Sequence, residues 1–172
     1  VEDPHGMENQ GKPRVGTGLN LLPVRTVFGT EKIVRRVRGC LCSHPFGRPL
    51  TSHTRFEGYE IHIGETFYDS GVRPLAKITR EGVLGAIADG AIDSSGRVMG
   101  TYVHGFFDND DFRHSFLQAA RVAVNLLPAV TWIDVAAHRE ARIDRLAGHL
   151  RNSLNIDLMK SWLVDPSRRG SL

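Results

Sequence analysis

The chain has 172 residues, a length that suits one domain or a piece of a larger one. Its 41% hydrophobic and 24% charged residues lie in the ordinary globular range, which excludes wholesale disorder and a fibrous repeat. The net charge of +3 comes from 22 basic and 19 acidic residues, and the basic ones are scattered, so we expect no nucleic-acid partner.

Membrane insertion and secretion are not expected either. No apolar run approaches the roughly 20 residues that span a bilayer, and residues 1–5 lack the basic region and apolar stretch of a secretory signal. Cys40 and Cys42 are too few and too close together for a disulfide framework, which fits a reducing compartment. We therefore expect a cytoplasmic protein with no membrane partner.

The first third of the chain predicts two short strands and a long loop. Residues 1–18 are rich in Gly, Pro, Asn and Gln and predict a loop. Residues 19–27, interrupted by Pro23, and residues 32–37 predict strands, the latter because of its β-branched side chains. Residues 39–56 show neither periodicity and predict a loop or an insertion.

The next segment has the alternation of a strand. Tyr59, Ile61 and Ile63 alternate with Glu60 and His62, which predicts one apolar face and one face with a carboxylate and an imidazole. One interpretation of this polar face, from its residues alone, is a surface in contact with solvent.

Further strands are predicted at residues 75–79, 84–92 and 98–103. The last of these follows a turn signal at residues 93–96 and runs directly into His104.

Two helices are predicted in the last third. Acceptor side chains at residues 108–110 precede apolar residues at near-helical spacing that end at Pro128. A second helix is predicted from about residue 135 to residue 154, capped by Asp134, with apolar residues along one face. The end of the chain after Leu163 predicts a frayed tail.

His104 is the most informative candidate for catalysis. A strand that delivers an imidazole to its carboxyl end, before a glycine that lets the chain turn away, is one way in which α/β enzymes place a base. The alternative is a histidine that only satisfies a loop carbonyl, because histidine has many uses outside catalysis.

Cys40, Cys42 and His44 form a second group of reactive side chains, with His53 or His62 nearby. The group can be written as a metal site, but its spacing is not the usual Cys-x-x-Cys knuckle and no second pair follows. We interpret the two cysteines as inert residues of a loop or insertion, because the loop lacks features that stabilise a thiolate.

Three segments together resemble the carboxy-terminal glutamine amidotransferase domain of cobyric acid synthases. They are GLNLLPV at residues 18–24, GYEIHIGET at 58–66 and GRVMGTYVHGFFD at 96–108, in the family's order and spacing. DPHG at residues 3–6 and HREARIDRLA at residues 138–147 also resemble family segments.

The resemblance implies an α/β fold of flavodoxin-like class I amidotransferase type, a mixed sheet with flanking helices. It implies glutamine hydrolysis, with the ammonia passed to an ATP- and Mg-dependent ligase domain that amidates a corrinoid substrate, adenosylcobyrinic acid a,c-diamide. His104 matches the family's catalytic base, and Glu60, His62 and Tyr102 are expected beside the glutamine pocket. Many related enzymes have a glutamate two residues beyond the histidine. This chain has Phe106 at that position, which is also a phenylalanine in the family that it resembles.

The family's nucleophilic cysteine lies upstream of the segment that residues 3–6 resemble. We therefore expect residues 1–163 to be the carboxy-terminal part of the domain, residues 164–172 a flexible tail, and the nucleophile, ATP and Mg sites to belong to a longer protein or a complementing chain. No cofactor is expected in this segment. The alternative is a non-catalytic remnant that acts at most as a binding module.

Overall fold

The computed structural model describes residues 1–50 and 55–164. The chain divides into two compact units, Val1–Trp132 and Ile133–Leu172. The first unit holds the sheets and one helix, and the second holds two helices. His53 and residues 165–172 of the predicted tail lie outside the described residues.

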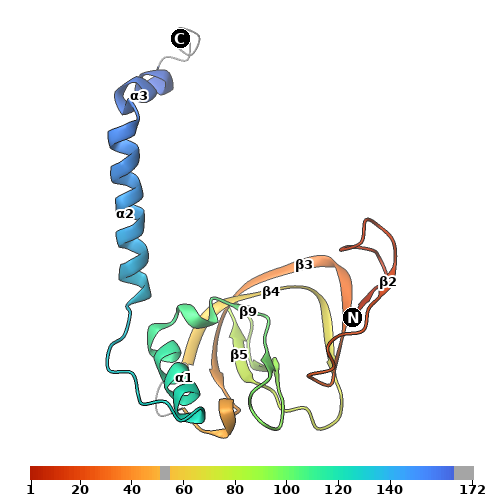
Figure 1. Cartoon of the computed structure of the whole chain (residues 1–172). Coiled ribbons are helices and arrows are strands. Elements are labelled where there is room, and N and C mark those ends of the chain that lie inside the picture. The colour runs from red at the N-terminus through yellow and green to blue at the C-terminus, as the bar shows by residue number, and fades with distance from the viewer. Residues whose placement is uncertain (51–54, 165–172) are drawn as a thin grey trace. The chain divides into compact units, whose positions relative to one another are not determined.

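The first unit is built around a long bent ribbon of two antiparallel strands, β3 (Val24–Leu41) and β4 (Arg55–Tyr68) (Figure 1). Their pairing shifts register between Val27 and Lys32. Gly64 lies at this irregularity with φ +105°, and a Cβ atom there would collide with the carbonyl oxygen of Val27. The irregularity therefore depends on glycine.

Strands β5 (Ala76–Arg80) and β6 (Ala86–Asp89) extend the sheet beyond β3, and β9 (Val103–His104) extends it beyond β4. Near the amino terminus, β1 (Glu2–Asp3) pairs parallel to β3 and antiparallel to β2 (Arg14–Val15). The described sheet is therefore mixed. A separate pair is formed by β7 (Ala91–Ile92) and β8 (Met99–Gly100).

The predicted strand boundaries in the first third are partly wrong. The two strands expected at residues 19–27 and 32–37 form one strand that starts at Val24, after Pro23. Residues 39–41, expected in a loop, continue that strand because they pair with β5, and β4 already begins at Arg55. Both errors come from long-range pairing, which local periodicity does not show.

The helices agree better with their predictions. The first predicted helix is α1 (Asp110–Ala123), and the second is α2 (Val135–Ser153), whose cap Asp134 accepts a hydrogen bond of 2.8 Å from the amide of Ala137. A short helix, α3 (Ile156–Val164), was not expected. Two 3-10 turns, η1 (Pro45–Gly47) and η2 (Phe106–Asp108), complete the described helical elements. The predicted α/β class, a mixed sheet with helices, is confirmed.

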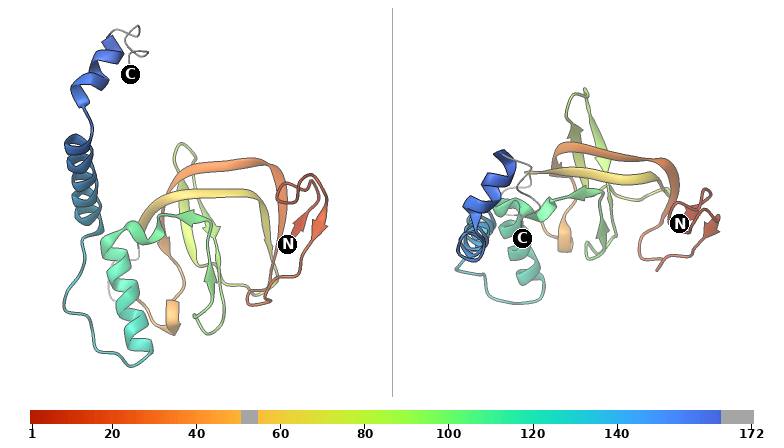
Figure 2. Two further views of the ribbon diagram at one scale, coloured as in Figure 1. Left: turned by 45° about the horizontal axis from the view of Figure 1, so that its top comes forward. Right: turned by 90° about the horizontal axis from the view of Figure 1, so that it is seen from above.

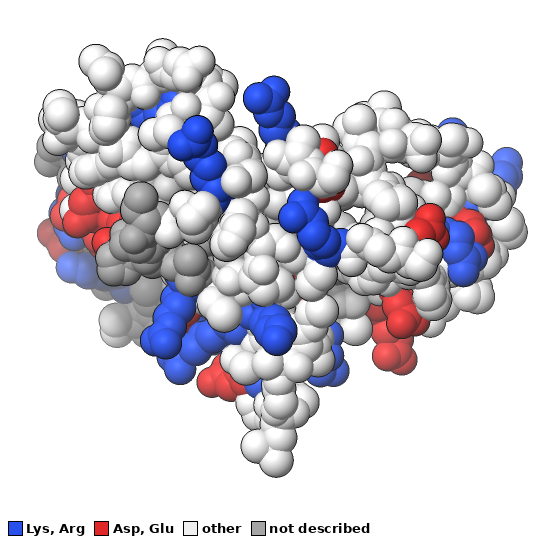
Figure 3. All heavy atoms as spheres, turned by 90° about the horizontal axis from the view of Figure 1, so that it is seen from below, with Lys and Arg blue, Asp and Glu red and all other residues white. Residues whose placement is uncertain are grey.

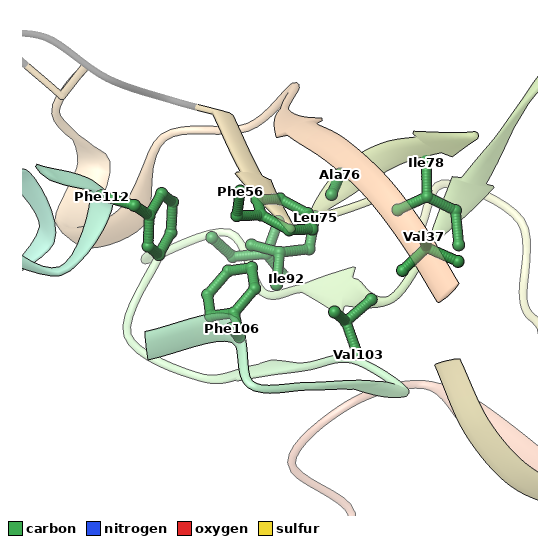
Figure 4. Packing of buried hydrophobic residues seen from close by; sticks show 9 residues of the cluster. All are labelled: Val37, Phe56, Leu75, Ala76, Ile78, Ile92, Val103, Phe106 and Phe112. Atoms are coloured by element: carbon green, nitrogen blue, oxygen red, sulfur yellow. The ribbon is translucent and has the colours of Figure 1, made fainter. Parts of the chain in front are cut away.

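The core of the first unit joins α1 to the sheet (Figure 4). Phe112 of α1 is fully buried, and its ring centroid lies 5.6 Å from that of Phe56 on β4 and 4.5 Å from that of Phe106. Burial of such a side chain contributes about 2 to 3 kcal/mol. The buried hydrophobic residues of this core are Val37, Phe56, Leu75, Ala76, Ile78, Ile92, Val103, Phe106 and Phe112.

The path of the first unit is clear in two further orientations (Figure 2), where β3 and β4 again run side by side. The basic side chains visible in Figure 3 lie in several groups with neutral side chains between them. No helix among the described residues is long and apolar enough to cross a membrane.

Candidate functional site

His104 ends the short strand β9 and is exposed. Directly paired residues of an antiparallel ladder place their side chains on the same face, so His104 lies beside Tyr59, and Val103 lies beside Glu60 on the opposite face. Gly105 then turns the chain away with φ +76°, in the left-handed region that glycine adopts without strain. The glycine turn after the imidazole is therefore present as expected. The strand expected at residues 98–103 is not continuous, because it is divided into β8 and β9, which belong to different sheets.

Gly58 allows β9 to approach β4 closely at this point. A Cβ atom at Gly58 would collide with the carbonyl oxygen of His104 and lie 2.7 Å from Cγ1 of Val103. Gly58, the first glycine of the GYEIHIGET segment, is therefore required for β9, the strand that carries His104, to pack closely against β4.

Glu60 is buried in the sheet and paired with an arginine. Its carboxylate accepts two hydrogen bonds of 2.7 Å from Nε and Nη2 of Arg80, and its Oε1 lies 3.3 Å from Nε2 of His62. Burial alone would raise the pKa of Glu60, but the hydrogen bonds and charge of Arg80, with His62 beside it, hold the pKa below its ordinary value. Glu60 is thus an ionised, buried partner of Arg80.

The exposure of β4 is the reverse of the prediction from its alternation. Glu60 is 3% exposed, whereas Tyr59 is 51% exposed. The face of Glu60 is covered because it belongs to the side of the sheet that packs into the core, next to Val103. The interpretation of Glu60 as part of a solvent-exposed polar face is therefore wrong.

His62 connects Glu60 to Tyr102. Its Nδ1 donates to the carbonyl oxygen of Gly64 at 2.6 Å, and its ring stacks on Tyr102 with centroids 4.5 Å apart. The hydroxyl of Tyr102 lies 2.5 Å from Oγ1 of Thr66. We call Glu60, Arg80, His62, Tyr102 and Thr66 the polar cluster.

A pocket of about 220 Å³ opens next to the polar cluster. Its wall is mostly apolar and also carries hydroxyl groups that can donate and accept hydrogen bonds. Its lining residues with hydroxyl groups are Thr26, Thr66, Tyr68, Thr101 and Tyr102.

Asp89 is buried and contacts a lining residue of this pocket. It accepts a hydrogen bond of 2.5 Å from the hydroxyl of Thr101. Burial raises the pKa of Asp89, and the charge of Glu60 raises it further. Burial also raises the pKa of Tyr68 at the pocket wall, where the charge of Asp89 adds to the effect. Neutral hydroxyls on the wall favour an uncharged group of a ligand there.

The structure brings three of the four sequence-predicted site residues together. Glu60, His62 and Tyr102 are members of the polar cluster, and Tyr102 also lines the pocket. His104 lies on the neighbouring strand with its side chain on the face opposite Glu60. Sequence reasoning missed Arg80, because the alternation in β4 did not show that Glu60 is buried and paired with a cation.

The two cysteines lie away from His104. Cys40 pairs with Arg55, four residues along β4 from Tyr59, which is about 13 Å of strand. Cys42 lies 3.4 Å from the carbonyl oxygen of Pro74, and burial raises the pKa of its thiol. Both features agree with cysteines that are not activated nucleophiles.

The described residues contain no group of three or more His, Cys, Asp or Glu side chains that could hold a metal ion. Cys40, Cys42 and His44 therefore do not form such a group within that part of the chain, and His53, the other residue considered, lies outside it.

Comparison with known proteins gives a consistent result. Residues 1–112 match the family described as CobB/CobQ-like glutamine amidotransferase domain. The chain is 39% identical over 158 residues to cobyric acid synthase of Moorella thermoacetica, covering 91% of this chain and 30% of that protein. It is 39% identical over 159 residues to cobyric acid synthase of Brucella anthropi, covering 92% of this chain and 28% of the relative.

A third relative, cobyric acid synthase of Clostridium botulinum, is 37% identical over 164 residues, which are 94% of this chain and 31% of the relative. The chain thus spans roughly 30% of the length of the curated relatives it matches. No solved structure matches the chain significantly.

Proposed function

The chain belongs to the CobB/CobQ-like glutamine amidotransferase family, and from this premise we propose that it forms part of the glutamine-hydrolysing unit of a cobyric acid synthase. In this proposal the ammonia released from glutamine is used to amidate carboxylates of adenosylcobyrinic acid a,c-diamide in cobalamin biosynthesis. The match to cobyric acid synthases over 91% of the chain is the observation that carries the proposal.

His104 is the proposed general base. Its imidazole removes the proton from a cysteine thiol, and the thiolate attacks the amide carbon of glutamine. The imidazolium then gives its proton to the departing ammonia, leaving a thioester that water hydrolyses to glutamate and free thiol. The exposure of His104 at the end of β9 supports this role, because a nucleophile supplied from outside these residues can reach it.

Glu60, His62 and Tyr102 are proposed to serve glutamine binding. Tyr102 offers its hydroxyl at the pocket wall, next to that of Thr66. Glu60 and His62 hold Tyr102 in place, since the ring of His62 stacks on Tyr102 and contacts the carboxylate of Glu60. The pocket size and its hydroxyls support a small polar ligand such as glutamine, whose amide extends past the edge strand β9 in this proposal to meet His104 on the other face.

The remaining partners belong outside this chain in our proposal. A longer protein or a complementing chain supplies the nucleophilic cysteine, and a ligase domain there binds ATP, Mg²⁺ and the corrinoid. The reaction is placed in the cytoplasm. Within this chain the proposed chemistry uses only the proton transfers of His104 and the contacts of the pocket.

The test compares two nitrogen sources in the complete enzyme that contains this chain. His104→Ala should abolish amidation with glutamine and preserve amidation with added ammonia, because the ligase chemistry does not use His104. A base of this kind contributes about 10² to 10⁴ in rate. His149→Ala, an exposed histidine on α2, is the matched control and should leave both activities unchanged.

Equal loss with both nitrogen sources would give His104 a structural role, and full retention of the glutamine reaction would end its assignment as the base. A non-catalytic remnant that acts at most as a binding module is the rival proposal. The family resemblance implies that the nucleophilic cysteine lies in a Cys-Gly-Gly turn. The genomic sequence upstream of Val1 separates the two proposals, because such a turn in frame, together with an ATP-binding domain, would support the enzyme.

A further inference from the structure

Asn109 holds the chain at the point where it leaves the sheet after His104. The pairing of β9 with β4 covers only two residue pairs, His104 with Tyr59 and Val103 with Glu60. Beyond them, at Glu57, the side chain of Asn109 takes the place of a strand. Its Oδ1 accepts a hydrogen bond of 2.9 Å from the amide of Glu57, and its Nδ2 donates one of 2.8 Å to the carbonyl of Glu57.

The same amide group also binds the turn that follows His104. Nδ2 of Asn109 lies 3.2 Å from the carbonyl oxygen of Gly105 and 3.3 Å from that of Phe106. One side chain therefore connects β4 to the two residues directly after His104. The backbone of His104 is fixed on one side by the ladder and on the other by this amide.

This use of Asn109 replaces its ordinary one. Asn109 is the N-cap residue of α1, a position where an asparagine oxygen normally accepts a hydrogen bond from an amide of the first helical turn. Here the side chain makes no such cap bond. The side chain of Asn109 instead forms hydrogen bonds with β4 and with the turn after His104.

Phe106, two residues after His104, has no polar side-chain atom that could orient the imidazole. In this chain Phe106 is buried, with its ring centroid 4.6 Å from that of Phe56 and 4.5 Å from that of Phe112. It anchors the turn in the core but offers no hydrogen bond to an imidazole.

We propose that Asn109 is a positioning residue for His104: by bridging Glu57 of β4 to the carbonyls of Gly105 and Phe106, it fixes the backbone of His104 and thereby the direction in which its side chain leaves the strand. This inference rests on the proposed role of His104 as the base. Asn109 does not touch glutamine in this proposal and acts only through the backbone on both sides of the turn.

The test uses Asn109→Asp in the complete enzyme. Aspartate keeps an oxygen for the amide of Glu57 and remains a good N-cap, but it places a second oxygen against three carbonyls where Nδ2 now donates. Asn155→Asp is the matched control, because Asn155 is an ordinary cap that accepts a hydrogen bond of 2.9 Å from the amide of Leu158.

We expect Asn109→Asp to lower kcat with glutamine by about 10- to 100-fold with little change in KM, and to leave the ammonia-dependent activity unchanged. Asn155→Asp should change neither. Asn109→Ser, which also caps helices but is too short to bridge, should reproduce the split. Unchanged kcat with glutamine, equal loss with both nitrogen sources, or failure of both Asn109 variants to fold would overturn the inference. Retained glutamine activity in His104→Ala would instead overturn the proposed function.

Discussion

At the residue scale, the buried charges determine how the first unit responds to pH. Glu60 and Asp89 are both buried acids, but Arg80 lowers the pKa of Glu60 whereas burial raises that of Asp89. The GYEIHIGET segment indicates Glu60 as a candidate site residue, and that role stays a prediction. Arg80 could not be predicted, because β5 meets β4 only through their common neighbour β3. Asp89 could not be predicted either, because its partner Thr101 lies in the segment between β8 and β9.

The ion pair of Glu60 is testable by removing its partner. Arg80→Met should lower the free energy of unfolding at pH 7 by about 3 kcal/mol, because the carboxylate is left buried without its main cation. Chemical denaturation of this chain measures the change. Arg38→Met is the control, since its pair with Glu57 is on the surface and should contribute less than about 1 kcal/mol.

The same pair predicts a pH dependence with a definite sign. The folded pKa of Glu60 is below its ordinary value of 4.5, so the stability it contributes is full above that value and is lost as the pH falls through the folded pKa. The difference between the parent chain and Arg80→Met should therefore shrink in acid. A difference that stays constant from pH 7 to pH 3 would contradict the assignment.

Asp89 predicts a change of stability with pH that has the opposite sign. Its folded pKa is raised by burial, so the folded state binds a proton more readily than the unfolded state, and stability falls as the pH rises from the ordinary value of 3.8 through the folded pKa. Asp89→Asn keeps an acceptor for Thr101 and removes the buried charge. Compared with the parent chain, it should gain stability from pH 3 to pH 7, which denaturation curves at both values measure. A loss over that range would contradict this account.

At the element scale, local signals predicted helices well and strands only partly. Helix α2 starts where its cap Asp134 indicates, because capping and a 3.6-residue period are properties of neighbouring residues. The continuation of β3 to Leu41 and the burial of Glu60 depend on β5 and β9, which pair with the ribbon from far along the chain. The alternation in β4 thus predicted the strand but not which face is covered.

Gly58 tests how closely β9 must lie against β4. Gly58→Ala should lower the free energy of unfolding by about 1 to 3 kcal/mol, because the added methyl group meets the carbonyl of His104 and the side chain of Val103. Gly148→Ala in α2 is the control, since a Cβ atom there has no neighbour within 4 Å and should raise helix stability by about 0.5 to 1 kcal/mol. Equal effects of the two substitutions in denaturation would contradict the close approach.

At the scale of the whole molecule, the second unit leaves one apolar face of α2 exposed. Four apolar residues recur at helical spacing along this face, three in α2 and one directly after its end. The exposed fraction of each is between 43% and 58%. They are Ile143, Leu146, Leu150 and Leu154.

We therefore expect this chain alone to self-associate or to melt without a sharp transition. Sedimentation measures the first and calorimetry the second. Leu146→Glu with Leu150→Glu should reduce self-association, whereas Asn152→Glu with Ser153→Glu, at exposed positions of the same helix, is the control for the same added charge. A monodisperse monomer with a sharp, cooperative melt would contradict this expectation.

The last prediction concerns activity: this chain alone should release no ammonia from glutamine. Its two cysteines are Cys40 and Cys42, and neither is placed as a nucleophile for His104. Burial raises the pKa of the Cys42 thiol, which lowers the thiolate fraction that attacks an amide. An assay of ammonia from glutamine should match the buffer blank, and Cys40→Ala and Cys42→Ala should give the same result. Ammonia release that disappears in either variant would show that the nucleophile lies within this chain. Release restored only by adding a protein with the Cys-Gly-Gly turn, and lost again in His104→Ala, would show that the base and the nucleophile come from separate segments.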